Sequence, residues 1–397
     1  MNFVFISPQF PDTYWHFCAA LRRNGATVLG IGDTPYDAIP NPLKEVLTEY
    51  YWTPSLEDYD QVLRAVGYFT WKYGKIDWLE SNNEYWLSQD ARLRDDFNIT
   101  TGANAAQMAR WQSKAEMKPL YAAGKVPTAR QARVTTLQAA QNFARKVGYP
   151  LFAKPEKGVG SGGATKISDA DELKAFFSRV LDEPYVIEEY VTGDICSYEA
   201  ILDSNGNPLF ENQCEFPPSM SDVVKYQLDV AYHARPTVDP KLQALGRAAA
   251  KSFGLKSRFV HMEFFRLTED KPGLGGVGDY VGLEVNVRPP GGYTPDMLNF
   301  AHSADTYQIW ADMVCFDERR QPESDDLYYA CYAGRRDCHT YVHSEAEIFE
   351  RYGNVLAMTG RIPDALSDDL CNQMYVARLR TEEERLAFEQ FVMEQRA

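Results

Sequence analysis

The stretch that decides the fold is residues 281–292, which read VGLEVNVRPPGG. Side chains alternate between the two faces of a strand, so Glu284, Asn286 and Arg288 share one face. An earlier apolar strand, FVHMEFF, carries Glu263 where it could join them. Two carboxylates and an amide are hard oxygen ligands, suited to Mg²⁺ that is shared with phosphates. The pattern predicts that Glu263, Glu284 and Asn286 are metal ligands, called the metal set below. A polar-faced strand with a structural salt bridge is the alternative.

The end of that strand carries a cation beside an unusual turn. Arg288 presents a planar guanidinium, which can hold a carboxylate or a phosphate with two hydrogen bonds. The next residues read PPGG, an uncommon ending for a plain sheet edge. Gly291 and Gly292 remove side chains beside Arg288 and leave room for a ligand. This turn is therefore a candidate binding site.

A glycine-rich loop lies earlier in the chain, in residues 150–164, which read PLFAKPEKGVGSGGA. An apolar strand delivers Lys154 and then ends at Pro155. The glycines that follow let backbone N–H groups approach phosphate oxygens, and Lys154 adds a point charge. No Gly-Lys-Ser/Thr follows at the spacing of a Walker A motif. A flexible hairpin tip is the alternative interpretation.

A third motif is a strand that ends in two carboxylates, YVIEEYVTGD at residues 185–194. Glu188 could accept a hydrogen bond from an adenine amino group. The backbone of Glu189 and Val191 could complete the contact with the edge of the base. The motif is weak when it stands alone, because glutamate pairs at strand ends are usually solvated.

The order of apolar runs predicts a parallel α/β sheet in the first hundred residues. Strands are expected at 3–7, 27–31 and 76–79, with helices at 13–24 and 56–73. The loop at 7–12 follows the first strand, where such sheets usually bind ligands. No Gly-x-Gly-x-x-Gly follows that strand, so a dinucleotide is not indicated.

The remaining chain has an α+β pattern. The expected elements are a helical connector at 105–123; strands at 133–135, 151–154 and 185–188; helices at 137–147 and 170–180; a polar linker at 317–326; strands at 328–333, 338–342, 354–360 and 375–379; and a closing helix at 381–396.

Taken in order, these motifs resemble the ATP-grasp superfamily, in the branch of carboxylate–amine ligases, amino acid ligases and biotin carboxylase-like proteins. The resemblance covers nearly the whole chain. It implies an α/β and α+β architecture: an ATP-grasp fold with an N-terminal Rossmann-like pre-ATP-grasp domain, a mobile lid and a C-terminal α+β lobe. The implied domains are residues 1–104, an ATP-grasp domain at 105–316 with its lid at about 126–189, and a segment at 317–397 that packs on the ATP-grasp core.

The resemblance also implies a role for each motif residue. The implied ATP-binding residues are Lys114, Lys154, Gly160, Ser161, Gly162, Gly163, Glu188, Glu189 and Val191. The implied metal ligands are Glu263, Glu284 and Asn286, holding Mg²⁺, with Mn²⁺ as an alternative. Arg288 would be catalytic and would also bind the substrate, together with Gly291 and Gly292.

His233 and the segment that follows the strand at 185–188 give two further points of comparison with the family. The stretch YHARP around His233 is similar to a His-x-x-Pro region in which a histidine lines the substrate site of amino acid ligases. A catalytic role as general base or acyl-phosphate stabiliser is one interpretation, and a surface histidine in a loop is the other. The family's ribose-binding Gly-x-Glu is replaced by Gly193-Asp194-Ile195, and Asp194 and Glu199 are the candidates to make the ribose contact instead. The Glu-His pair that follows the arginine in biotin carboxylases is absent.

Composition narrows the class of partner and the compartment. The formal net charge of −15 argues against nucleic acid, and no apolar run is long enough to span a membrane. Seven cysteines without paired spacing, and no secretory signal, predict a cytoplasmic protein. Zinc on Cys331, Cys338, His339 and His343 is a weak hypothesis, because no close Cys-x-x-Cys occurs. Glu84 could face substrate but is interpreted as structural.

The resemblance implies an ATP-dependent ligase (EC 6.3 type) that joins a small-molecule carboxylate to an amine through an acyl phosphate, releasing ADP and phosphate. A homodimer is left open. Two alternatives stand beside this function: a carbamoyl phosphate synthase-like or carboxylating enzyme that uses bicarbonate, and a non-catalytic nucleotide-binding protein.

Overall fold

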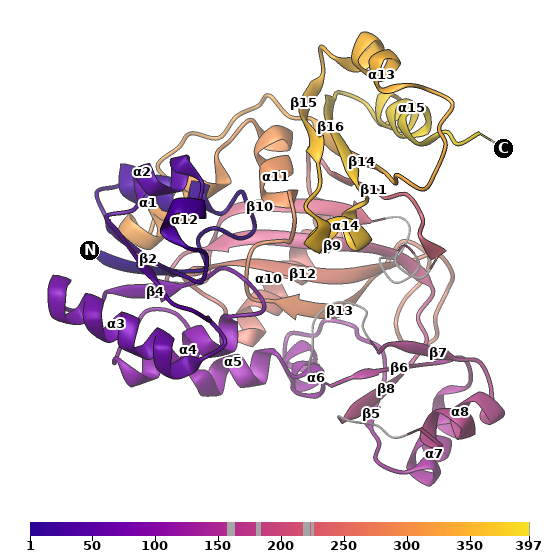
Figure 1. Cartoon of the computed structure of the whole chain (residues 1–397). Coiled ribbons are helices and arrows are strands. Elements are labelled where there is room, and N and C mark those ends of the chain that lie inside the picture. Colours follow the sequence, from indigo (N-terminus) through magenta and orange to yellow (C-terminus); the bar gives the residue numbers. More distant parts are fainter. Residues whose placement is uncertain (157–162, 180–183, 217–222, 224–225, 397) are drawn as a thin grey trace.

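The computed structural model of the chain describes residues 1–156, 163–179, 184–216, 223 and 226–396. These residues form three sheets, which Figure 1 shows as an N-terminal α/β unit, a small sheet with two helices, and a large central sheet. No helix in these ranges combines the length and apolar character needed to cross a membrane.

The N-terminal unit is a four-stranded parallel sheet in the order β3-β2-β1-β4. Its elements are β1 (Asn2–Ile6), α1 (Trp15–Arg23), β2 (Thr27–Gly32), α2 (Asn41–Val46), β3 (Glu49–Trp52), α3 (Tyr59–Tyr73), β4 (Trp78–Glu80) and α4 (Leu87–Asp96). The parallel sheet expected from the sequence is confirmed. The short strand β3 was missed because its half-exposed EYYW sequence has no clear apolar alternation.

Two helices, α5 (Ala105–Trp111) and α6 (Lys114–Ala123), connect this unit to the rest of the chain. Asn104 and Gln107 form a capping box at the start of α5. Ser113 caps α6 and also donates a hydrogen bond to the carboxylate of Glu156, 2.9 Å away. This second contact fixes the first turn of α6 against the end of strand β6 (Leu151–Pro155).

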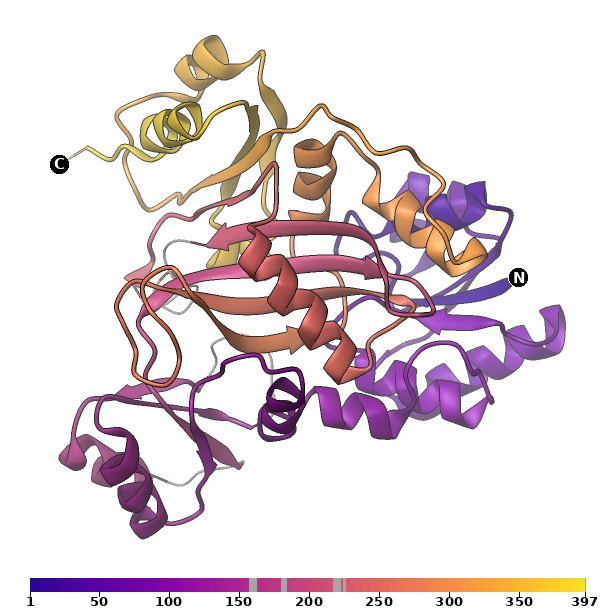
Figure 2. The same ribbon diagram turned by 180° about the vertical axis from the view of Figure 1, so that it is seen from behind.

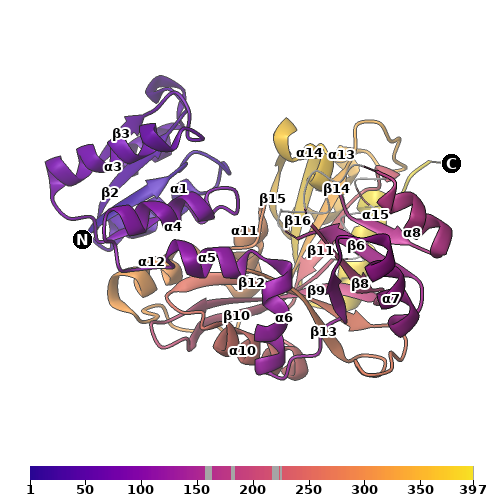
Figure 3. The ribbon, with the colours of Figure 1, turned by 90° about the horizontal axis from the view of Figure 1, so that it is seen from below.

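The small sheet has four antiparallel strands in the order β5-β8-β6-β7. Its elements are β5 (Gln131–Arg133), α7 (Leu137–Val147), β6, β7 (Thr165–Ile167), α8 (Ala170–Phe177) and β8 (Tyr185–Glu189). The two helices pack on one face of this sheet around a core of their own. Figure 3 shows the unit standing beside the large sheet, with α6 between them.

The central sheet has eight strands in the order β13-β12-β9-β10-β11-β14-β16-β15. Five of these strands are β9 (Gly193–Leu202), β10 (Pro208–Phe216), β11 (Ala231–Ala234), β12 (Arg258–Leu267) and β13 (Tyr280–Asn286). Helix α10 (Pro240–Phe253) lies across one face (Figure 2), while α11 (Thr294–His302) and α12 (Thr306–Phe316) join the N-terminal unit in a shared core.

The C-terminal segment supplies the remaining three strands of the same sheet. Its elements are β14 (Tyr329–Arg335), α13 (Glu345–Tyr352), β15 (Leu356–Arg361), α14 (Asp364–Leu370), β16 (Gln373–Leu379) and α15 (Glu382–Met393). The strand expected at 338–342 is wrong: these residues form turns and one isolated bridge, from Tyr341 to Gln395. The Tyr341 hydroxyl instead donates to Asp229, 2.8 Å away, which holds the segment as a loop.

Candidate active site

The two glutamates expected to bind metal lie directly opposite each other on β12 and β13. Glu263 pairs with Glu284 in the strand register, and Asn286 pairs with His261. The side chains of Glu263 and Glu284 are 29% and 21% exposed, so both carboxylates remain reachable. The structure thus brings the predicted set together on one face of two adjacent strands.

Cations from α6 and the small sheet surround these carboxylates. Lys114 Nζ lies 3.2 Å from Glu284 Oε1. Burial raises the pKa of Glu284 above its ordinary value; Lys114 opposes this shift, and the neighbouring charge of Glu263 adds to it. Burial would also raise the pKa of Glu263, but the hydrogen bond and charge of His261 outweigh it and hold that pKa below its ordinary value.

Lys154 and Glu188 form a buried ion pair on adjacent strands β6 and β8. Lys154 Nζ lies 2.8 Å from Glu188 Oε2, and Lys118 Nζ lies 2.7 Å from Glu188 Oε1. Although burial acts to raise the pKa of Glu188, the two lysines lower it to about 2. The Glu188 carboxylate is therefore an anion that orients Lys154. Glu188 Oε2, which among the described residues contacts only Lys154, can accept a second hydrogen bond, so the adenine-accepting role expected for this side chain stays a prediction.

At the hinge between the small sheet and β9, Glu189 makes polar contacts and Val191 makes apolar ones. The Glu189 carboxylate accepts from the Arg130 backbone N–H at 2.7 Å and from its guanidinium at 2.5 and 3.0 Å, so this side chain is committed to structure. Val191 instead joins a small apolar cluster with Val281, and Phe265 packs against it. Phe265 and Val281 lie opposite each other, two residues beyond Glu263. An apolar floor therefore leads from the hinge to the carboxylates, suited to a planar base.

The glycine loop can be assigned only at its end. Gly160, Ser161 and Gly162 lie outside the described residues. Gly163 has φ +76°, and a Cβ there would come within 2.9 Å of the Tyr185 hydroxyl and 3.1 Å of Pro155. The position therefore needs a glycine, both for its backbone conformation and for space.

Arg288 faces the N-terminal unit as well as the metal set. Its Nε lies 3.1 Å from Glu84 Oε2, and its Nη1 donates to the carbonyl of Pro289 at 2.8 Å. The interpretation of Glu84 as purely structural is thereby corrected: it lies at the site as the partner of Arg288. An added Cβ at Gly291 would meet nothing within 4 Å, whereas Gly292 has φ +59° and packs against Leu370.

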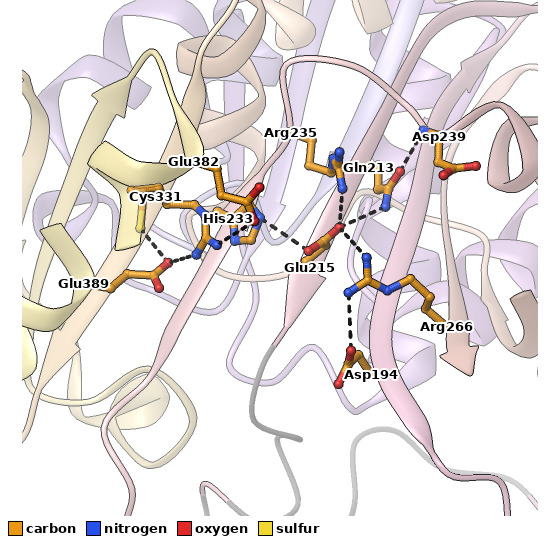
Figure 4. Close-up of polar contacts among 11 residues, drawn as sticks. Asp194, Gln213, Glu215, His233, Arg235, Asp239, Arg266, Cys331, Glu382 and Glu389 are labelled. Carbon is orange, nitrogen blue, oxygen red and sulfur yellow. Dashed lines mark hydrogen bonds and ion pairs between the residues drawn. The ribbon is translucent and has the colours of Figure 1, made fainter. Parts of the chain in front are cut away.

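His233 does not join this group, which corrects its expected catalytic role. Glu263 lies opposite Ser197, which lies opposite Cys214, which lies opposite Ala234, so Ala234 shares the face of the metal set. Its neighbour His233 therefore points to the reverse face. Figure 4 shows His233 there beside Glu215, 3.6 Å away, within a group of ion pairs.

Asp194 also belongs to the group of ion pairs on the reverse face of the sheet. Its carboxylate lies 3.4 Å from Arg266, in the same group (Figure 4), and so points away from the metal set. Glu199 is on the metal side but is fully buried between protein groups. Neither carboxylate is placed to hold a ribose.

The zinc hypothesis is not supported. Cys331 lies 3.2 Å from Glu389, His339 lies 3.0 Å from Asp229, and His343 lies 3.1 Å from Glu394. In the ranges that the structure describes, no three His, Cys, Asp or Glu side chains converge as a metal site would require.

A site of two carboxylates and one amide, completed by substrate phosphates, needs no such group of three. Its fit can be tested on a buried hydroxyl. Tyr121 Oη, on α6, is buried without a hydrogen-bond partner among the described residues. Burial and the nearby charges of Glu284 and Glu263 raise its pKa well above the ordinary value. A hydroxyl left unpaired beside two carboxylates fits a centre that a cation and its ligands complete.

Three residues of the site were missed by the sequence interpretation. Lys118 follows Lys114 by one helical turn, so it lies on the same face of α6. His261 precedes Glu263 by two strand positions and therefore shares its face. Both signals are visible in the sequence. Gln131, whose amide donates to Glu188 at 2.9 Å, is placed only by strand pairing between β5 and β8.

The sequence is similar to a known family model and to two characterised ligases. Residues 111–226 match the family model of the carbamoyl-phosphate synthase L chain, ATP binding domain. An alanine–anticapsin ligase from Bacillus subtilis is 22% identical over 326 residues, which is 73% of this chain and 65% of the relative. A D-alanine–D-alanine ligase from Streptomyces avermitilis is 30% identical over 166 residues, which is 39% of this chain and 40% of the relative.

Solved structures match over nearly the whole length. The L-amino acid ligase from Bacillus licheniformis superposes with a TM-score of 0.73 at 15% identity, covering 98% of this chain and 96% of that one. The N5-carboxyaminoimidazole synthetase from Staphylococcus aureus gives a TM-score of 0.69 at 15% identity, covering 98% and 97%. The chain thus shares its fold with both structures.

Proposed function

We propose that this chain is a member of the ATP-grasp superfamily and an ATP-dependent ligase that joins a carboxylate to an amine through an acyl phosphate, releasing ADP and phosphate. The substrates that we propose are a small-molecule acid and a small-molecule amine. The relatives include ligases for alanine and anticapsin and for two D-alanines, which supports this class of substrate.

The observation that carries the proposal is the cross-strand pair Glu263–Glu284, which faces two lysines from different elements. Lys114 begins α6, and Lys154 lies in the small sheet. Cations from two elements that converge on paired carboxylates form a site suited to a metal and to polyphosphate. Arg288 lies two positions beyond Asn286, just past the end of β13, and supplies a fork for an acid.

We assign the roles as follows. Glu263, Glu284 and Asn286 would hold Mg²⁺ or Mn²⁺, which neutralises phosphate charge when bound. Lys114 and Lys154 hold the phosphates, and Glu188 keeps Lys154 oriented. Arg288, with the open turn at Gly291, binds the acid near the transferred phosphoryl group. The small sheet covers the site and excludes water from the acyl phosphate.

A carboxylating or carbamoyl phosphate synthase-like reaction is the second candidate, because residues 111–226 match an ATP-binding domain model from that enzyme. It differs in its acceptor, which would be bicarbonate. The same assay tests it when bicarbonate is supplied without another acid.

The test is a screen for ADP release, in which amino acids and other small carboxylates are paired with amines and the products are identified by mass spectrometry. Glu284→Gln is the matched control, because it removes one anionic ligand and keeps the side-chain shape. We expect amide product and ADP in equal amounts from the wild-type chain and none from the variant. ADP release by the variant at the wild-type rate would remove Glu284 from the metal set.

A further inference from the structure

A line of buried polar side chains runs across the central sheet and ends at Glu263. His261 Nε2 lies 3.4 Å from Glu263 Oε1, and His261 Nδ1 lies 2.9 Å from Glu199 Oε1. Both ring nitrogens thus face carboxylates. Glu199 has no exposed surface, so solvent does not compete for its oxygens.

The line continues past Glu199 to a helix that packs on the same face of the sheet. Asn212 Nδ2 donates to Glu199 Oε2 at 2.8 Å, and Ser197 Oγ donates to Oε1 of the same carboxylate. The Asn212 side-chain oxygen lies 2.8 Å from His302 Nε2, at the end of α11. Strands β12, β9 and β10 and helix α11 are therefore tied together by side chains that lead to one glutamate.

We propose that His261 and Glu199 are positioning residues, which fix the Glu263 carboxylate in the orientation that a metal ion needs, with Asn212 and His302 anchoring the pair. The inference rests on the proposed function, because it takes Glu263 as a metal ligand. Buried polar groups hold one geometry only when every partner is present, and here both oxygens of Glu199 and both nitrogens of His261 are engaged.

The alternative is that the line only stabilises the sheet. The two accounts differ in what a substitution changes. A stabilising role predicts a lower melting temperature with unchanged metal affinity. A positioning role predicts weaker metal binding in the nucleotide complex. Nucleotide binding without metal should be unchanged, because the substitution alters neither the apolar floor nor the two lysines.

The experiment measures Mn²⁺ binding in the presence of ADP by electron paramagnetic resonance, and metal-free ADP binding by calorimetry. For His261→Asn, whose amide can reach Glu199 but not Glu263, we expect Mn²⁺ affinity to fall about 10- to 100-fold, as for other groups that orient a metal ligand. Metal-free ADP affinity should stay within about twofold, since the substitution removes no phosphate or base contact. His261→Gln, whose longer amide can reach Glu263, should recover part of the loss.

Two further variants separate positioning from general damage. Glu199→Gln keeps the shape of the Glu199 side chain and should also weaken Mn²⁺ binding. This variant gives a second measurement if His261→Asn fails to fold. His233→Asn changes a buried histidine of the same sheet on the opposite face and should leave Mn²⁺ affinity unchanged. Unchanged Mn²⁺ affinity in folded His261→Asn and Glu199→Gln would overturn the inference alone. Absence of Mn²⁺-dependent ADP binding in the wild-type chain would overturn the proposed function with it.

Discussion

At the residue scale, the buried carboxylate of Glu188 balances two buried lysines. Glu188→Gln would leave Lys118 and Lys154 without that anion, and breaking a buried pair in this way costs about 3–5 kcal/mol of unfolding free energy. Urea denaturation measures the loss. Asp337→Asn is the matched control, because it breaks an exposed pair with Arg361 and should cost less than about 1 kcal/mol. Equal losses of unfolding free energy in the two variants would show that the Glu188 carboxylate does not offset the charges of the two buried lysines.

The buried His233 makes stability depend on pH. Burial, followed by the nearby cations Arg385, Arg235 and Arg266, lowers its pKa from 6.5 to about 3. Between these values the unfolded chain binds the proton and the folded chain does not. The free energy of unfolding should therefore fall as pH drops from 6.5 towards 3, by up to about 1.4 kcal/mol per pH unit.

His233→Asn removes that titration and should make the decline shallower in denaturation curves between pH 7 and pH 4. The decline should not vanish, because His302 is also buried and burial lowers its pKa to about 4. A pH dependence identical to that of the wild-type chain would contradict this account of His233.

Residues on one strand were predictable, and contacts between distant segments were not. The alternation along residues 281–292 was sufficient to group Glu284, Asn286 and Arg288. The contact between Arg288 and Glu84 joins the turn after β13 to the N-terminal unit, and nothing in the local pattern indicates it. The error on His233 has a similar cause, because the face it points to depends on which residue of β10 lies opposite.

At the element scale, the turn after β13 offers a matched pair of glycines. Gly292 has φ +59°, and a Cβ there would lie 2.8 Å from Leu370 Cδ1. Gly292→Ala should therefore lower the free energy of unfolding by about 1–2 kcal/mol through backbone strain and crowding. In Gly291→Ala the added Cβ would have no neighbouring atom within 4 Å, so the free energy of unfolding should be unchanged. Thermal denaturation of both variants checks this, and equal stability would argue against a strained position at Gly292.

The elements themselves were predictable to differing degrees. Helices α3 and α15 were expected from the sequence at 56–73 and 381–396. The structure begins them at Tyr59 and Glu382, directly after the N-cap residues Asp58 and Thr381. Residues 338–342 have the composition of a strand, but the preceding strand β14 already pairs with β11 and β16. The segment therefore has no sheet edge there to join, and its polar side chains bind neighbouring loops instead.

At the scale of the whole molecule, the expected ATP-grasp fold is confirmed, and the C-terminal strands complete its central sheet rather than forming a sheet of their own. The boundaries at 104 and 316 remain proposals, as do the homodimer and the cytoplasmic location. Sequence patterns identified the strands of this segment. Which sheet they join depends on pairing with distant strands, and the local sequence of one strand does not identify its partner.

We propose that the small sheet, residues 126–189, closes over bound nucleotide as a lid. Saturating Mg-ADP should then reduce the radius of gyration measured by X-ray scattering, because a separate unit moves towards the central sheet. Lys154→Met is the control, since it removes a phosphate contact contributed by the lid itself. A wild-type chain that scatters identically with and without Mg-ADP would contradict lid closure.

The central claim is that the acid becomes an acyl phosphate before the amine attacks. The most direct measurement uses the acid found in the screen, labelled with ¹⁸O in its carboxylate, together with ATP, Mg²⁺ and the amine. The account predicts that one labelled oxygen moves from the acid to the released phosphate, which mass spectrometry detects. Amide product accompanied by phosphate without label would contradict the account, because the carboxylate oxygen would then never have bonded to phosphorus.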